Sequence, residues 1–124
     1  MRETILLVDD DRLLGNIGIF RLDDPMSPTG GEIGYWAHPD ARGRGAVSEA
    51  VELVLAHAFT PRESGGLGRH RVQLGASWDN AASRHVAERA GFTLVGHFRQ
   101  DGVVGDGELD DGAWYDLLAA DAAR

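Results

Sequence analysis

A glycine-rich turn between a strand and a helix is the part of this sequence best suited to chemistry. An aromatic strand ends at Pro39, and the turn Arg42-Gly43-Arg44-Gly45-Ala46 leads into a helix with periodic apolar residues. Because glycine has no side chain, several backbone N–H groups of such a turn can converge on one anion. The positive end of the helix dipole adds to their field. This arrangement favours the binding of a pyrophosphate.

A second group of polar residues lies at the start of a later helix. The segment Trp78-Asp79-Asn80-Ala81-Ala82-Ser83-Arg84-His85-Val86-Ala87-Glu88-Arg89-Ala90-Gly91-Phe92 places a serine three residues after an asparagine. Either Asp79 or Asn80 can cap the first turn, and Gly91 fits the C′ position that ends the helix. Ser83 either faces solvent or donates a hydrogen bond within a site. Capping alone would explain Asn80.

Taken together, the two segments resemble the acyl-CoA-binding motifs of the GNAT N-acetyltransferases. The resemblance is to the RimJ/RimL-type branch in particular, which includes the ribosomal-protein N-terminal acetyltransferases, and it covers nearly the whole chain. It implies an enzyme that uses acetyl-CoA as its cofactor and transfers the acetyl group to a primary amine, either a protein N-terminus or a small molecule. The chain has no cysteine to hold an acyl group, so the amine is expected to attack directly.

The resemblance also implies which residues bind the cofactor. The pyrophosphate is assigned to the backbone amides of the turn 42–46, and Asn80 to the pantetheine arm. Family sequences favour Gly or Ala where this chain has Val47, which could narrow the turn. The predicted cofactor-binding residues are Trp36, Ala37, His38, Arg42, Gly43, Arg44, Gly45, Ala46, Asn80 and Ser83. The alternative for the two arginines is that they are solvated turn residues.

Glu32 and Ser83 are the predicted catalytic residues. Many GNAT enzymes place a tyrosine near the departing thiol, at the position held here by Ala87. The RimJ/RimL-type branch relies instead on the serine, so Ser83 is expected to donate a hydrogen bond to the sulphur. Glu32 is the candidate base, its alternative being a solvated strand-end carboxylate. Strand amides around Trp36 to His38 are the expected donors to the oxyanion.

Two other interpretations of the polar residues are weaker. A dinucleotide fingerprint, Gly43-x-Gly45-x-x-Ser48, lacks its third glycine, and a hairpin precedes it instead of a βαβ unit. The five histidines are scattered without the spacing of metal ligands, so no metal is expected.

Hydrophobic periodicity places these residues on a small α+β fold with a three-layer character. Strands are predicted at 3–8, 13–22, 32–38, 71–77, 92–98 and 113–118, with a long Gly- and Asp-rich turn between the last two, and helices at 47–59 and about 80–90. The order resembles the GNAT fold, a mixed, mostly antiparallel sheet with two main helices, without the usual first strand and two helices. A single domain spanning 1–124 is expected. In the third strand Ile33, Tyr35 and Ala37 share one face, and Glu32, Gly34 and Trp36 share the other.

Composition narrows the class of protein. The formal net charge is −8, which argues against nucleic acid as a partner. No apolar run approaches the length of a membrane span, no signal peptide opens the chain, and cysteine is absent, so a cytoplasmic protein without membrane association is expected.

A second functional class follows from the shortened start. The chain could be a non-catalytic CoA-binding or interaction module, because the missing strand and helices usually help to build the acceptor site. An unpaired sheet edge invites pairing with a second copy, and a homodimer could complete that site in trans.

Overall fold

The computed structural model describes residues 3–9, 12–38, 45–103 and 107–122. Six strands form one sheet in the order β1-β2-β3-β4-β6-β5, in which β3 and β4 are parallel and the other neighbours antiparallel. The elements are β1 (Glu3–Asp9), β2 (Arg12–Phe20), β3 (Gly30–Ala37), α1 (Ala46–Phe59), the 3-10 turn η2 (Arg62–Ser64), β4 (Arg71–Ser77), α2 (Ala81–Arg89), β5 (Thr93–Val103), β6 (Leu109–Leu118) and α3 (Ala119–Ala122). The predicted element order is confirmed, as is an α+β fold with a mixed, mostly antiparallel sheet and two main helices.

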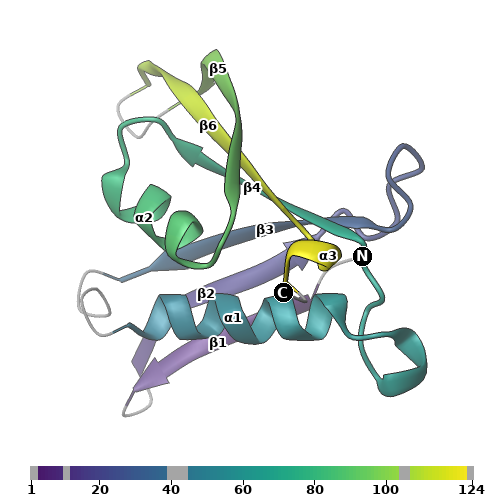
Figure 1. Ribbon diagram of the computed structural model, residues 1–124. Helices are drawn as coiled ribbons and strands as arrows, with labels where there is room; N and C mark the ends of the chain where they lie inside the picture. Colours follow the sequence, from purple (N-terminus) through teal and green to yellow (C-terminus); the bar gives the residue numbers. More distant parts are fainter. Residues whose placement is uncertain (1–2, 10–11, 39–44, 104–106, 123–124) are drawn as a thin grey trace.

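Both long helices pack on one face of the sheet. In Figure 1, α1 crosses β1 and β2, and α2 lies beside β4. The core joins the apolar stripe of α1 to the inward side chains of the strands. Its largest fully buried side chains are Tyr115, Ile17, Ile19, Ile33, Leu74, Val51 and Val72. Each such side chain stabilises the fold by roughly 1.5–3 kcal/mol.

The sheet opens between β3 and β4. The two strands pair only over Gly30–Ile33 with Arg71–Leu74. Beyond that point β3 continues beside β2, while β4 continues beside β6. Figure 1 shows the two strands diverging toward the left of the view. Beyond Ile33 and Leu74 the backbones of β3 and β4 are therefore not paired with each other.

Arg69 holds the connection between β2 and β3. Its guanidinium is buried, and Nη1 donates to the carbonyl oxygens of Leu22 (2.9 Å), Pro28 (3.2 Å) and Gly30 (3.2 Å). Nε donates to the carbonyl of Leu67 at 3.0 Å. Burial, and to a smaller extent the charge of a neighbouring arginine, lowers the pKa of Arg69. The Arg69 side chain therefore has a structural role: it satisfies the backbone carbonyls of the β2–β3 connection.

The predicted turn between the last two strands is wrong, because most of it belongs to a hairpin. β5 continues to Val103 and β6 begins at Leu109, with an irregular register between Phe98 and Gly102. The Asp111 carboxylate accepts the backbone N–H of Gln100 at 2.9 Å. This contact satisfies the backbone where the ladder is distorted, so Gly- and Asp-rich sequence is compatible with a strand here.

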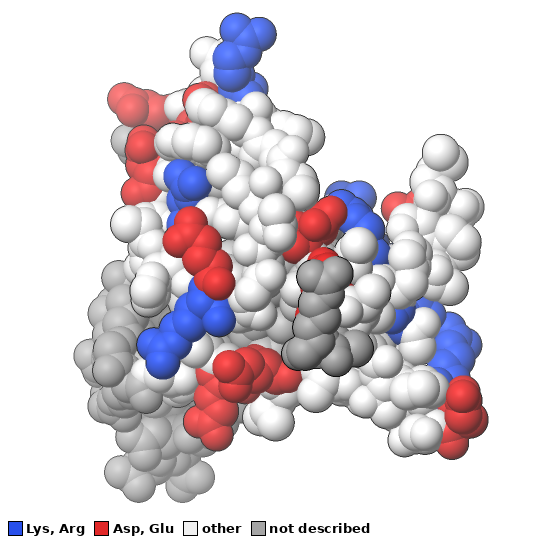
Figure 2. Space-filling model, in the orientation of Figure 1, with Lys and Arg blue, Asp and Glu red and all other residues white. Residues whose placement is uncertain are grey.

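Charges of both signs are mixed on the surface. Figure 2 shows arginine and carboxylate side chains interspersed on one face of the molecule. In the described part of the chain, none of the helices is both long and apolar enough to cross a bilayer. The same residues contain no group of three or more His, Asp or Glu side chains placed to hold a metal ion.

Candidate functional site

A pocket of about 540 Å³ lies where β3 leaves β4, beside the first turn of α1 and one side of α2. This volume is typical of small-molecule sites. The lining residues are Tyr35, Trp36, Ala37, Gly45, Val47, Ser48, Asn80, Ala82, Ser83, His85, Val86 and Arg89. Gly45 of the glycine-rich turn and the Asn80–Ser83 segment at the start of α2 therefore contribute to the same pocket.

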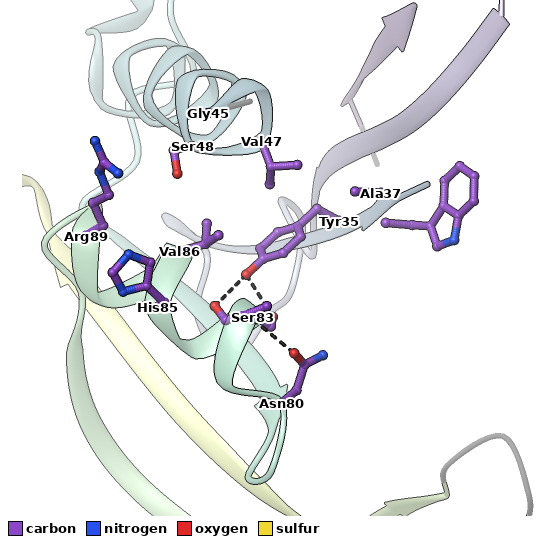
Figure 3. Close-up of a pocket in the computed structure, with 12 residues that line it drawn as sticks. Tyr35, Ala37, Gly45, Val47, Ser48, Asn80, Ser83, His85, Val86 and Arg89 are labelled. Carbon is purple, nitrogen blue, oxygen red and sulfur yellow. Dashed lines mark hydrogen bonds between the residues drawn. The ribbon is translucent and has the colours of Figure 1, made fainter. Parts of the chain in front are cut away.

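The charge of the lining differs from that of the chain. The sequence contains 20 acidic residues, yet none is among the described residues that line the pocket. Arg89 and His85 do line the pocket, and Figure 3 shows both on the same side of it as Ser48. The pocket is therefore suited to an anionic ligand. Sequence reasoning missed these two side chains, although Ala82, His85, Val86 and Arg89 follow the helical i, i+3, i+4, i+7 spacing.

The start of α1 adds a second feature suited to an anion. Gly45 is the N-cap residue and has a φ of 73°, a left-handed conformation that glycine adopts easily. No described side chain caps this end, and the first N–H groups of a helix have no acceptor within it. Of the predicted turn, Gly45 lines the pocket and Ala46 begins α1. Arg42, Gly43 and Arg44 lie outside the described residues.

Ser83 is held from two sides. Asn80 caps α2, since its Oδ1 accepts the backbone N–H of Ser83 at 3.0 Å. From β3, the Tyr35 hydroxyl donates to the Ser83 carbonyl oxygen at 2.8 Å and lies 2.8 Å from Ser83 Oγ. Figure 3 shows these contacts between the strand and the helix. Tyr35 was missed as a functional residue, because the pattern of β3 gives its face and not its partner.

Burial raises the pKa of Tyr35. The hydrogen bond to Ser83 lowers this pKa by a smaller amount, and the nearby Tyr115 adds to the increase. The hydroxyl therefore stays protonated at neutral pH and remains a hydrogen-bond donor.

We expect Tyr35 to ionise above its ordinary pKa of 10.0. The folded state binds this proton more tightly than the unfolded state, so its stabilisation is complete below pH 10.0 and is lost as the pH rises through the folded pKa. The sequence has two tyrosines, so Tyr115→Phe leaves Tyr35 as the single phenol. Phenolate absorbance of that variant measures the midpoint, and a value at or below 10.0 would contradict the expectation.

Glu32 lies on the other face of the sheet from Tyr35 and does not line the pocket. Its Oε1 accepts a hydrogen bond from Gln73 Nε2 at 2.7 Å and pairs with Arg21 Nε at 3.3 Å. Gln73 is oriented in turn by Arg71 Nη1, at 3.0 Å from its Oε1. With 12% of its side chain exposed, Glu32 is a partnered residue within β3, and the alternative of a solvated strand-end carboxylate is wrong.

The other predicted residues of β3 divide into two groups. Trp36 and Ala37 line the pocket, whereas His38 does not. The His38 N–H donates to the Leu14 carbonyl oxygen at 2.6 Å. That amide is engaged within the sheet, so the expectation that it donates to an oxyanion is wrong. The roles of the amides of Trp36 and Ala37 stay predictions.

Comparison with known proteins gives one family. A model of the acetyltransferase (GNAT) domain matches residues 2–93. The ribosomal-protein-serine acetyltransferase of Escherichia coli (strain K12) is 34% identical over 95 residues, which cover 77% of this chain and 49% of that protein. The chain spans about half the length of the curated relatives it matches.

Solved structures agree with that match. The structure of RimL, a ribosomal L7/L12 α-N-protein acetyltransferase in complex with coenzyme A, superposes with a TM-score of 0.77 at 25% identity, covering 94% of this chain and 62% of RimL. The spermidine/spermine N-acetyltransferase SpeG from Vibrio cholerae has the same fold, with a TM-score of 0.80 at 18% identity, covering 98% of this chain and 68% of SpeG.

Proposed function

Because this chain belongs to the GNAT acetyltransferase family, we propose that it transfers an acetyl group from acetyl-CoA to a primary amine by direct attack. The observation that carries this proposal is the pocket at the start of α1, beside the opening of the sheet: its described lining includes no carboxylate, and no described side chain caps the helix there. The acceptor is a protein N-terminus or a small amine.

The pocket residues fit the acyl donor. The first-turn amides of α1 would hold the pyrophosphate, and His85 and Arg89 supply donors for phosphate oxygens. Asn80 Oδ1 is occupied by the Ser83 N–H, which leaves its amide NH₂ for the pantetheine arm. When bound, acetyl-CoA supplies an acetyl group activated as a thioester.

The amine is proposed to approach from the opposite face of the sheet, through the opening between β3 and β4. Glu32 lies on that face within the short paired segment of β3, where it can accept a proton directly or through water. Deprotonating a peptide α-amino group at pH 7 costs roughly 1 kcal/mol, against about 4.6 kcal/mol for a lysine side chain. An N-terminal amine is therefore easier to deprotonate than a lysine side chain, which suits a base such as Glu32 whose carboxylate already has two partners.

The test combines binding and turnover. Calorimetric titration with acetyl-CoA is expected to show micromolar affinity, and free-thiol release is measured with three acceptors: a peptide with a free N-terminus, an N-blocked peptide containing lysine, and spermidine. The chain contains no lysine, so an acetyl group gained by the protein itself would lie on its N-terminus and is identified by mass spectrometry. A folded protein that neither binds acetyl-CoA nor releases thiol contradicts the proposal.

Variants of Asn80 separate its two roles. Asn80→Ala removes the cap at a cost of about 1 kcal/mol of stability, whereas Asn80→Asp keeps a capping oxygen and loses the NH₂. We expect both to weaken acetyl-CoA binding; restored binding in Asn80→Asp would make Asn80 a cap alone. Binding without turnover of any amine would favour the non-catalytic module, and sedimentation would show whether a homodimer is needed for activity.

A further inference from the structure

We propose that Tyr35 is a positioning residue for Ser83, which it holds so that the serine hydroxyl donates its hydrogen to the sulphur as the acetyl group leaves. This inference rests on the proposed function and adds a residue to it. Tyr35 belongs to β3 and Ser83 to α2, which follows β4 in the chain, so the contact spans the opening of the sheet.

Counting hydrogens shows why this pair has two states. The Tyr35 hydroxyl carries one hydrogen and has two acceptors at the same distance, the Ser83 carbonyl oxygen and Ser83 Oγ, both at 2.8 Å. While Tyr35 donates to the carbonyl, the short contact between the two hydroxyls requires the Ser83 hydrogen to point at the Tyr35 oxygen. The serine hydrogen is then unavailable to a ligand.

Turning the Tyr35 hydrogen toward Ser83 Oγ reverses this arrangement. Ser83 then accepts from Tyr35, and its own hydrogen is free to point into the pocket that both residues line. The Ser83 carbonyl loses little, because within α2 it can accept the N–H four residues further on. Negative charge on a nearby sulphur favours this second state, since a hydroxyl that also accepts a hydrogen bond is a stronger donor.

The transfer step balances without a proton from Tyr35. The amine lone pair forms the C–N bond, the C–S bond breaks, and its electron pair stays on the sulphur. The nitrogen loses one proton to Glu32 or water, and the sulphur gains one from water after the product forms. Burial raises the pKa of Tyr35, so the phenol keeps its proton and only donates a hydrogen bond. Tyr35 and Ser83 thus stabilise the departing thiolate.

The test measures CoA binding beside binding of desulpho-CoA, which lacks the thiol. A hydrogen bond to the thiolate lowers the pKa of the bound thiol from its ordinary value of about 8.5. The ratio of CoA to desulpho-CoA affinity is therefore expected to rise about tenfold as the pH approaches that value in the wild type. Any other pH-dependent contribution to binding affects both ligands alike and cancels in the ratio.

Two single variants, their double variant and one control decide between positioning and a structural role. In Tyr35→Phe and in Ser83→Ala the ratio is expected to stay flat with pH, and kcat to fall about tenfold while KM for acetyl-CoA changes less than twofold. The double variant is expected to be no worse than either single one, because the two hydroxyls act as a unit. Tyr115→Phe is the matched control: it loses a buried phenol that contacts Arg84 and Glu88 instead of Ser83.

The outcomes also separate this inference from the proposed function. A wild type that binds CoA and turns over amine, together with a Tyr35→Phe variant of unchanged ratio and kcat, overturns the role of Tyr35 alone. A Tyr35→Phe variant that loses only thermal stability, as is expected of Tyr115→Phe, likewise overturns the role of Tyr35 alone. A folded wild type without affinity for CoA overturns the proposed function and this inference together.

Discussion

Replacing Arg69 with methionine is expected to lower the free energy of unfolding by about 3–5 kcal/mol, a large part of the stability of a small domain. The side chain is buried (the residue is 4% exposed), and its guanidinium donates to backbone carbonyls. Methionine fills much of the volume but leaves these carbonyls without their donor, and each unsatisfied buried group costs roughly 1–3 kcal/mol.

Urea unfolding measures this difference, and Arg62→Met is the matched control. Arg62 lies in the nearby 3-10 turn, where it is exposed, so its replacement is expected to change stability by no more than about 0.5 kcal/mol. An Arg69→Met variant as stable as Arg62→Met would show that solvent or a local rearrangement satisfies the carbonyls of the β2–β3 connection.

The Gly45→Glu substitution is expected to weaken acetyl-CoA binding by about 100-fold or more. Gly45 is the N-cap of α1 and lines the pocket, and no atom of the described residues lies within 4 Å of a Cβ placed there. A carboxylate at this point would occupy the anion position and repel phosphates. Two like charges about 4–5 Å apart near a protein surface repel by roughly 3–4 kcal/mol, which exceeds the 2.7 kcal/mol of a 100-fold loss.

The control must reproduce the backbone strain without the charge. Gly45 has a φ of 73°, and Asn tolerates this conformation better than other non-glycine residues. Gly45→Asn is therefore expected to remain folded and to bind acetyl-CoA within about tenfold of the wild type. Calorimetry on both variants, with circular dichroism to confirm folding, makes the comparison. Equal losses in both would place the effect in the backbone instead of in the charge.

Local patterns were sufficient to predict the order of the eight main elements. The apolar stripe of α1 and the cap and stop of α2 are set within a few residues of sequence, and both occur as predicted. The ends of β5 and β6 were predicted wrongly, because the Asp111 carboxylate stabilises a strand where the composition favours a turn.

The contacts that could not be predicted from the sequence join residues far apart in the chain. Tyr35 and Ser83 are 48 residues apart, and Gln73 lies 41 residues from Glu32. Such pairs depend on the strand order, which places β3 beside β4, and on the packing of α2 against β4. The arginine pair at 69 and 71 illustrates the same limit: Arg69 is buried against carbonyls, and Arg71 pairs with Asp116 at 3.3 Å.

The short paired segment between β3 and β4 has a kinetic consequence if acetyl-CoA enters from the helix side of the sheet and the amine from the other side. The two substrates then have separate entrances, so abundant amine does not obstruct the thioester. Spent coenzyme A would compete with fresh acetyl-CoA and not with the amine. The acetylated product would be able to leave while the coenzyme stays bound.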